Sequence, residues 1–235
     1  GKPADARERQ LLAPFKTEVK DDVLEGRFSF PVTDGSGHNR DNQRLAFALL
    51  QKAGYAVRGG RLRETATGAP LTFEILAHNN TPLALLNTFA RGLEPLGIAV
   101  RVRLVDSAQY QARLMTYDFD MIYTMWPSSL SPGNEQLFRW SSKNAGNPGS
   151  FNYAGVKSPA ADAMVEAMLA AETQDDFVSA VRALDRVLIS GDYVIPLFHA
   201  PRQWIAHWAR VKHPAKTPVS GWALAIDCWW IDEQK

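Results

Sequence analysis

The sequence has few of the features that stabilise small secreted domains or cross membranes. Its 235 residues include a single cysteine, Cys228, so no disulfide can form within the chain, and we expect that side chain to be a small buried hydrophobe. No apolar run approaches the length of a membrane span. The 26 Lys and Arg nearly balance the 25 Asp and Glu, which argues against nucleic acid as a partner.

Sequence signatures of nucleotide, metal and catalytic sites are also absent. No phosphate loop, dinucleotide-binding glycine pattern or zinc-ligand spacing occurs, and the five histidines are scattered, so we expect no cofactor and no metal. Asp118 and Asp120 would share one face of a strand, as paired catalytic acids do. Carboxylates more often belong to turns and strand edges, and we favour that interpretation here. Ser128, Ser129 and Ser131 follow a strand but lack the G-x-S-x-G elbow.

The sequence does contain a regular alternation of strands and helices between residues 71 and 125. A series of strand, helix, strand, helix and strand predicts a parallel sheet with right-handed crossovers, and hence an α/β fold. The strands are expected at residues 71–77, 98–105 and 120–125, with helices at 81–97 and 107–115. Further helices are expected at 5–15, 41–53, 158–169 and 173–190, and further strands at 193–200 and 226–231.

An irregular stretch, residues 127–153, follows the third strand of this series. Open α/β sheets bind ligands at the carboxyl ends of their strands, and long irregular segments are usually functional loops. This stretch offers aromatic rings, hydroxyls and amides with little charge, which suits binding of polar ligands better than catalysis. An ordinary crossover loop is the alternative. We expect six side chains to contact a ligand: Trp126, Ser129, Ser131, Asn134, Asn152 and Tyr153.

The two ends of the chain differ from this central α/β part. Five of the seven tryptophans follow position 200, in a tail that does not look like a domain of its own. So many aromatic side chains need a surface to pack against. The polar start, residues 1–9, is not a signal peptide, so we expect a removed leader or an internal fragment. We infer that both ends pack on polypeptide outside this sequence.

Seven short stretches carry a family resemblance over nearly the whole chain: residues 31–40 (PVTDGSGHNR), 117–122 (YDFDMI), 130–135 (LSPGNE), 152–159 (NYAGVKSP), 183–188 (ALDRVL), 194–196 (VIP) and 229–230 (WW). They resemble the C-terminal part of the dipeptide/oligopeptide-type extracellular solute-binding proteins of ABC importers, family 5. The resemblance is strongest to the branch associated with peptide and microcin C uptake.

This resemblance implies a non-enzymatic periplasmic protein whose two lobes close on a ligand. Residues 33–190 would form the α/β second lobe, which binds the ligand. Residues 1–32 would pack on the missing first lobe, and residues 191–235 would cross the hinge to reach it. The implied partners are a peptide or peptide-like solute and the transmembrane permease of an ABC importer.

One departure from the family pattern concerns the loop after Trp126. In better-known members, an Asp in this loop resembles an anchor for the peptide amino terminus, whereas here the loop reads WPSSLS and has no acid before Glu135. A neutral loop cannot supply that charge-assisted bond. Peptide-like or modified peptide ligands are therefore expected, with sugars or other polar solutes as alternatives.

Two other classes of protein share this element pattern. An α/β hydrolase or transferase would use the loop serines, with His199 as the only plausible partner. A stand-alone sensory or receiver-like domain would use acids near the sheet. That reading is weakened because Asp118 and Asp120 flank one strand and no Lys ends a later strand.

Overall fold

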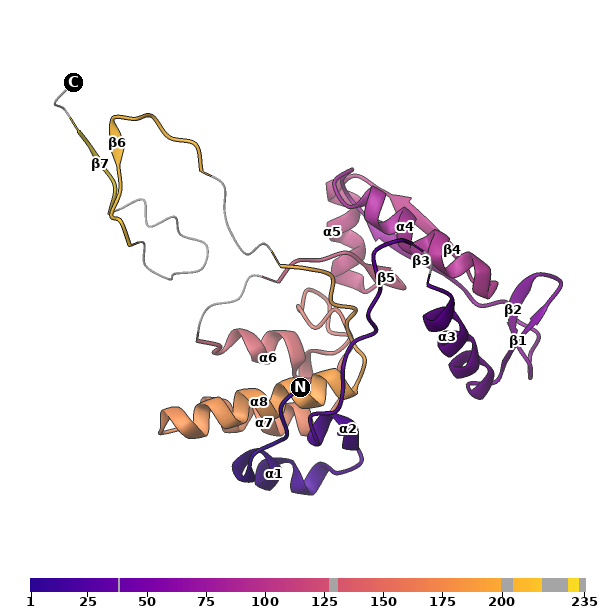
Figure 1. Cartoon of the computed structure of the whole chain (residues 1–235), viewed down its shortest axis with the longest axis horizontal. Helices are drawn as coiled ribbons and strands as arrows, with labels where there is room; N and C mark the ends of the chain where they lie inside the picture. Colours follow the sequence, from indigo (N-terminus) through magenta and orange to yellow (C-terminus); the bar gives the residue numbers. More distant parts are fainter. Residues whose placement is uncertain (38, 127–130, 200–204, 217–227, 233–235) are drawn as a thin grey trace.

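The computed structural model describes residues 1–37, 39–126, 131–199, 205–216 and 228–232 (Figure 1). Its helices are α1 (Ala6–Leu12), α2 (Asp21–Leu24), α3 (Arg40–Lys52), α4 (Leu83–Leu93), α5 (Ser107–Thr116), α6 (Glu135–Trp140), α7 (Pro159–Leu169) and α8 (Gln174–Ser190). Its strands are β1 (Tyr55–Arg58), β2 (Arg61–Glu64), β3 (Thr72–Ala77), β4 (Ala99–Leu104), β5 (Met121–Ile122), β6 (Val211–Lys212) and β7 (Trp230–Ile231). Short 3₁₀ turns span Ala13–Phe15, Glu94–Leu96 and Ser142–Asn144. None of the helices within these described ranges combines the length and apolarity needed to cross a bilayer.

The predicted parallel sheet is present, with strand order β4-β3-β5. The central strand β3 pairs with β4 along its whole length and with β5 through Ile75 and Leu76. Successive β3 side chains point to opposite faces. Ile75 therefore packs with Leu86 of α4, while Leu76 packs with Tyr110 and Leu114 of α5. Both Ile75 and Leu76 are fully buried, because a helix covers each face of the sheet.

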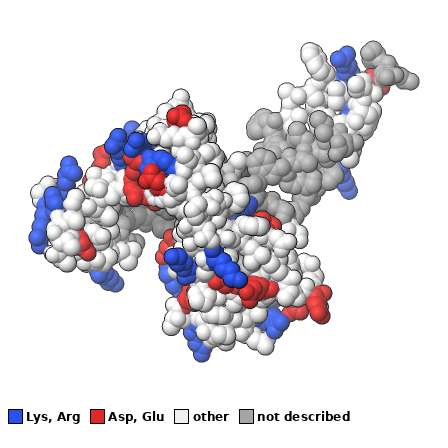
Figure 2. Space-filling model, turned by 180° about the vertical axis from the view of Figure 1, so that it is seen from behind, with Lys and Arg blue, Asp and Glu red and all other residues white. Residues whose placement is uncertain are grey.

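The antiparallel hairpin of β1 and β2 was not among the predicted strands. Its two-residue turn, Gly59-Gly60, has positive φ at both positions, as the favoured tight hairpin turn requires. The hairpin meets the sheet through the bond from the Leu62 N–H to the Gly97 carbonyl, at 2.8 Å. Gly97 has φ 80°, and a Cβ there would lie 2.7 Å from the Leu62 nitrogen, so glycine permits this close approach. Figure 2 shows basic side chains along the margin formed by β1, β2 and α3, and mixed charges elsewhere.

Helices α7 and α8 form the second core, which we call the helical cluster. Ser158 and Thr173 cap their N-termini by accepting bonds from the Ala161 and Asp176 amides. The cluster also buries two residues from the start of the chain. Its buried members are Leu12, Val19, Trp140, Val156, Ala160, Ala161, Met164, Val165, Met168, Ala180, Ala183, Leu184 and Val187.

Residues 1–32, which the sequence assigns to contacts with a missing lobe, pack on α8 through most of their length. Glu8 is buried and accepts a 2.5 Å bond from the Arg186 Nε. Arg186 also donates to the backbone carbonyls of Val23 and Lys2, at 2.6 and 2.9 Å. The guanidinium thus ties three points of the N-terminal segment to α8. The buried residues of the segment are Ala4, Glu8, Leu12, Val19 and Val23, and at its end Val32 is 84% exposed.

The described part of the tail differs from the prediction at two places. Residues 193–199 form no strand, and their apolar side chains, including the 75% exposed Phe198, face solvent. Cys228 is exposed rather than buried, because it flanks β7 in a hairpin that stands apart from every core cluster (Figure 1). Trp230 in β7 is half exposed. The predicted strand at 226–231 is reduced to β7, and residues 226 and 227 lie outside the described ranges.

The buried ion pair predicts a stability difference between two arginines. Replacing Arg186 by Met removes the close buried cation and leaves the buried Glu8 carboxylate only the exposed Arg182 at 4.0 Å, which should lower the free energy of unfolding by about 3 kcal/mol. Arg7→Met is the matched control, because the pair between Arg7 and Asp176 is exposed and should contribute little. Urea unfolding of both variants measures the difference. Equal destabilisation by the two substitutions would contradict this role of Arg186.

Candidate functional site

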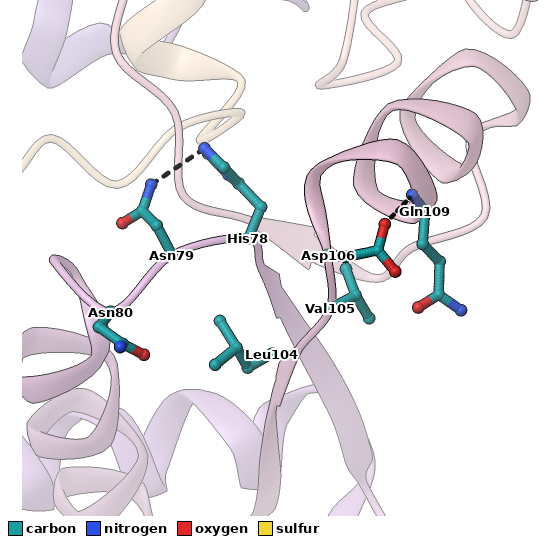
Figure 3. A pocket seen from close by; sticks show the side chains of 7 residues that line it. All are labelled: His78, Asn79, Asn80, Leu104, Val105, Asp106 and Gln109. Carbon is teal, nitrogen blue, oxygen red and sulfur yellow. Dashed lines mark hydrogen bonds between the residues drawn. The ribbon is translucent and has the colours of Figure 1, made fainter.

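The three parallel strands end at one edge of the sheet, which we call the carboxyl edge. Residues following β3 and β4 surround an open depression of about 580 Å³ at this edge (Figure 3). Polar and apolar groups line it about equally, and the apolar floor comes from the end of β4. The lining residues are His78, Asn79, Asn80, Leu104, Val105, Asp106 and Gln109. We call this feature the polar depression.

His78 is held in place by two neighbours. Its ring lies 4.4 Å from the Tyr110 ring of α5, centroid to centroid. The Asn79 amide nitrogen lies 2.9 Å from its Nε2, as the dashed line in Figure 3 shows. An amide nitrogen has only hydrogens to offer, so Nε2 accepts and the neutral ring carries its proton on Nδ1. Asn79 is itself fixed, because its carbonyl oxygen accepts from the Thr81 amide at 3.0 Å.

Two tyrosines join the polar depression to the segments after β5 and around residue 153. Tyr110 is buried and donates from its hydroxyl to the Tyr123 carbonyl at 3.2 Å. Burial raises the pKa of Tyr110, and nearby Tyr153 raises it further. The pKa of Tyr153 is likewise raised, first by burial and then by Tyr117. Both phenols therefore stay protonated near neutral pH and remain hydrogen-bond donors.

The two acids nearest this region are engaged at the starts of helices. Asp106 precedes α5 and accepts from the Gln109 amide at 2.8 Å. Glu135 begins α6, and both its carboxylate oxygens lie 3.0 Å from the Gly133 amide nitrogen. Burial tends to raise the pKa of Glu135, but these backbone bonds bring it below the usual value. Its carboxylate therefore stays ionised and stabilises the turn before α6 by accepting from the Gly133 amide.

Trp126 lies on the helical side of the carboxyl edge. Its ring meets the Trp140 ring edge-on, with centroids 4.9 Å apart, and it packs against the helical cluster. Trp140 donates from Nε1 to the Gln136 side chain at 2.8 Å, whereas the buried Nε1 of Trp126 has no hydrogen-bond partner among the described residues. A ring packed in this way is partly a core residue, so Trp126 contributes to stability more than a loop residue would.

The other predicted contacts fall in different environments. Ser131 and Asn134 are exposed beside α6, and Asn134 makes no side-chain capping bond. Ser129 lies outside the described residues. Tyr153 packs on the sheet side, against Leu76, Val105, Tyr110 and Leu114. The stretch from Trp126 to Tyr153 therefore bridges the two cores, with Trp126 on one and Tyr153 on the other.

Asn152 has a structural role that its sequence position does not reveal. Its side chain is fully buried, and the amide donates to the Ser141 and Val156 carbonyls at 3.0 and 2.9 Å. Its carbonyl oxygen accepts from the Val156 amide at 2.9 Å. All three partners are backbone groups, so Asn152 holds two parts of the loop together. In this structure it positions the loop and does not face a cleft.

Reasoning from sequence missed the polar depression, although a signal for it was present. His78 and Asp106 directly follow predicted strands, and the rule that ligands bind at strand carboxyl ends applies to all three strands. Asp118 and Asp120 lie at the opposite end of β5, where Asp118 pairs with Arg113 and Asp120 accepts from the Glu74 amide, both at 2.9 Å. Those two acids belong to a turn and a strand edge.

Features expected of an enzyme do not gather at the carboxyl edge. His199, the candidate partner of the loop serines, is exposed in the stretch after α8 and forms no side-chain hydrogen bond with another described residue. No group of three or more His, Cys, Asp or Glu within the described ranges could hold a metal ion. The described residues thus form an α/β fold with an open hollow at the carboxyl edge of its sheet.

Comparison with known proteins identifies the family of this lobe. The model of the bacterial extracellular solute-binding proteins, family 5 (middle region), matches residues 18–148, more than half of the chain. The chain belongs to this family, which is one of extracellular substrate-binding proteins and not of enzymes. Its structural neighbours are two-lobed periplasmic binding proteins.

Similarity extends over the whole chain but covers only part of each relative. A binding protein of Brucella melitensis is 53% identical over 234 residues, which is 100% of this chain and 38% of that protein. The peptidoglycan-binding protein YepA of Agrobacterium fabrum is 43% identical over 230 residues, or 98% of this chain and 37% of its own. The oligopeptide-binding protein AppA of Bacillus subtilis, solved with a nonapeptide, has the same fold, with a TM-score of 0.58 at 18% identity over 80% of this chain and 40% of that one. The chain spans about two-fifths of these proteins.

The two asparagines of the loop should differ sharply in their effect on stability. Asn152→Ala leaves the buried Val156 amide and carbonyl without partners and removes one of the two bonds to the Ser141 carbonyl, which also accepts from the Asn144 amide; it should cost about 3 kcal/mol. Asn134→Ala removes an exposed amide without a capping bond and should leave the free energy of unfolding nearly unchanged. Chemical denaturation of the two variants provides the measurement. A stable Asn152→Ala variant would show that the loop is held by other contacts.

Proposed function

We propose that this chain is the C-terminal part of the substrate-binding component of an ABC importer. That component captures peptides or peptide-like solutes in the periplasm and delivers them to a transmembrane permease. The observation that carries the proposal is membership of family 5 together with chain-long similarity to binding proteins. Besides YepA, the YejA protein of Agrobacterium fabrum, whose name describes it as peptide-binding, is 38% identical over 224 residues.

The proposed ligand site is the carboxyl edge, closed by a first lobe outside this sequence. On one side of it, Trp126, Ser129, Ser131, Asn134 and Tyr153 are the proposed ligand contacts, while Asn152 holds their loop. On the other side, His78 and Asn79 add an imidazole and an amide from the polar depression. These groups donate and accept hydrogen bonds without net charge, which suits the amides and hydroxyls of peptide-like ligands.

The exposed apolar surface supports the two-lobed arrangement. Phe30 and Val32 before α3, and Ile195 and Phe198 after α8, are each at least half exposed. Large apolar side chains left exposed in two segments are expected at an interface. We assign both segments to the crossing toward the first lobe, so the boundary on the N-terminal side lies after α2.

The engaged acids predict how the protein treats the amino terminus of a peptide. Glu135 accepts bonds in the turn before α6, and Asp106 caps α5, so neither is a dedicated anchor for an ammonium group. N-acetylation of a peptide ligand should therefore change its dissociation constant by less than about threefold, well under the loss of a charge-assisted bond. Calorimetry with the full-length protein and matched free and acetylated peptides measures this. A tenfold preference for the free amine would require an acidic anchor.

Trp126 should affect both affinity and stability. In the full-length protein, Trp126→Ala should weaken ligand binding by about 30-fold, or about 2 kcal/mol, as loss of an aromatic anchor typically does. It should also lower the melting temperature, because the ring packs on Trp140. Trp126→Phe is the control that retains a ring. If the folded fraction of Trp126→Ala binds with native affinity, Trp126 is a packing residue only.

A further inference from the structure

Three aromatic rings gather on the hairpin of β6 and β7, far from the carboxyl edge. The rings of His207 and His213 lie 5.5 Å apart, centroid to centroid. Trp229 lies 5.4 Å from His207 and 5.2 Å from His213, so each ring contacts the other two. Both imidazoles are exposed. The six-residue spacing of these histidines matches no metal-ligand pattern in the sequence. The hairpin brings the two rings together.

Hydrogen bonds to the backbone determine which nitrogen of each imidazole carries the proton. The His207 Nδ1 lies 3.1 Å from the Trp208 carbonyl oxygen, and the His213 Nδ1 lies 2.9 Å from the Pro214 carbonyl oxygen. A carbonyl oxygen only accepts, so Nδ1 must be the donor in both rings. In each neutral ring, Nε2 therefore keeps its lone pair. Within the described residues, neither Nε2 has a hydrogen-bond partner.

This arrangement is the one that protein metal sites use to prepare histidine ligands. A ligating imidazole almost always donates its second nitrogen to a carbonyl or carboxylate, which fixes the tautomer and the ring orientation. Contact with Trp229 further limits the rotation of both rings. The two histidines are therefore held with the correct nitrogen available.

The separation of the two rings also fits a shared ion. Zinc–nitrogen bonds measure about 2.0–2.1 Å and each ring centroid lies about 1 Å further out, so two imidazoles on one tetrahedral ion have centroids about 5 Å apart. The observed centroids lie 5.5 Å apart with the ring planes at 84°, so the distance fits, and a rotation of one ring brings both Nε2 atoms onto one ion. We propose that His207 and His213 form a two-histidine binding site for a borderline divalent cation, of the class of Zn²⁺, Ni²⁺ and Cu²⁺.

No third His, Cys, Asp or Glu of the described chain completes a larger metal group. Water or a group from another molecule then occupies the remaining coordination positions. A site with two protein ligands binds its ion reversibly, as a sensor or a docking point does, and does not lock it in as a structural zinc site would. The inference is independent of the proposed transport function, because the rings lie outside the ligand site.

The test is a Zn²⁺ titration of the full-length protein by calorimetry. The wild type should bind one ion at this site, and His207→Asn or His213→Asn should each weaken that binding by at least about tenfold, since even loss of a group that only orients a ligand costs 10–100-fold. His199→Asn is the matched control, an exposed histidine with no side-chain hydrogen bond to the described residues, and it should bind zinc as the wild type does. Circular dichroism checks that each variant is folded.

Electron paramagnetic resonance with Cu²⁺ supplies a second readout that does not depend on affinity. The wild type should show two imidazole nitrogens bound to copper, and each single variant should show one. Absence of zinc binding up to about 1 mM would overturn the proposal. So would wild-type binding in both His207→Asn and His213→Asn, or equal loss in His199→Asn.

Discussion

The burial of β3 on both faces is the constraint on which the lobe depends. Because Ile75 and Leu76 point in opposite directions and both are fully buried, a helix has to cover each face of the sheet. Right-handed crossovers then place α4 on one face and α5 on the other. With the strand order fixed in this way, the segments after β3, β4 and β5 meet at one edge. The sheet therefore determines where the candidate site lies, and the side chains of the loops determine which groups it offers to a ligand.

Regular elements of this lobe could be predicted from the sequence because their signals are local. In α7 and α8 these signals are the N-caps, Ser158 and Thr173, and the helical spacing of apolar residues. Both involve residues that lie only a few positions apart in the sequence. The N-terminal packing could not be predicted in the same way. It rests on a pair between Glu8 and Arg186, which are 178 positions apart, and no local pattern reveals such a contact. The hairpin turn at Gly59-Gly60 did carry a local signal.

For the candidate site, the sequence indicated where the loops gather but not what each side chain does there. Asn152 is polar and lies in an irregular stretch, which fits a ligand contact and a backbone clamp equally well. Only the positions of the Ser141 and Val156 backbone groups decide between them. His78 shows the reverse case, a residue with no motif around it that the end of β3 brings to a hollow surface. The residue type therefore indicates which bonds a side chain can form, and its position in the structure shows whether it bonds to the backbone or faces the hollow.

The helical cluster also sets an order of events during synthesis. All contacts of the parallel sheet lie between residues 72 and 122, so the sheet can form as soon as that stretch leaves the ribosome. Leu12 and Val19 are made earlier, yet their partners in α8 appear more than 150 residues later. At bacterial translation rates, this gap lasts on the order of ten seconds. Until α8 is made, the apolar side chains of Leu12 and Val19 lack part of the cluster that buries them.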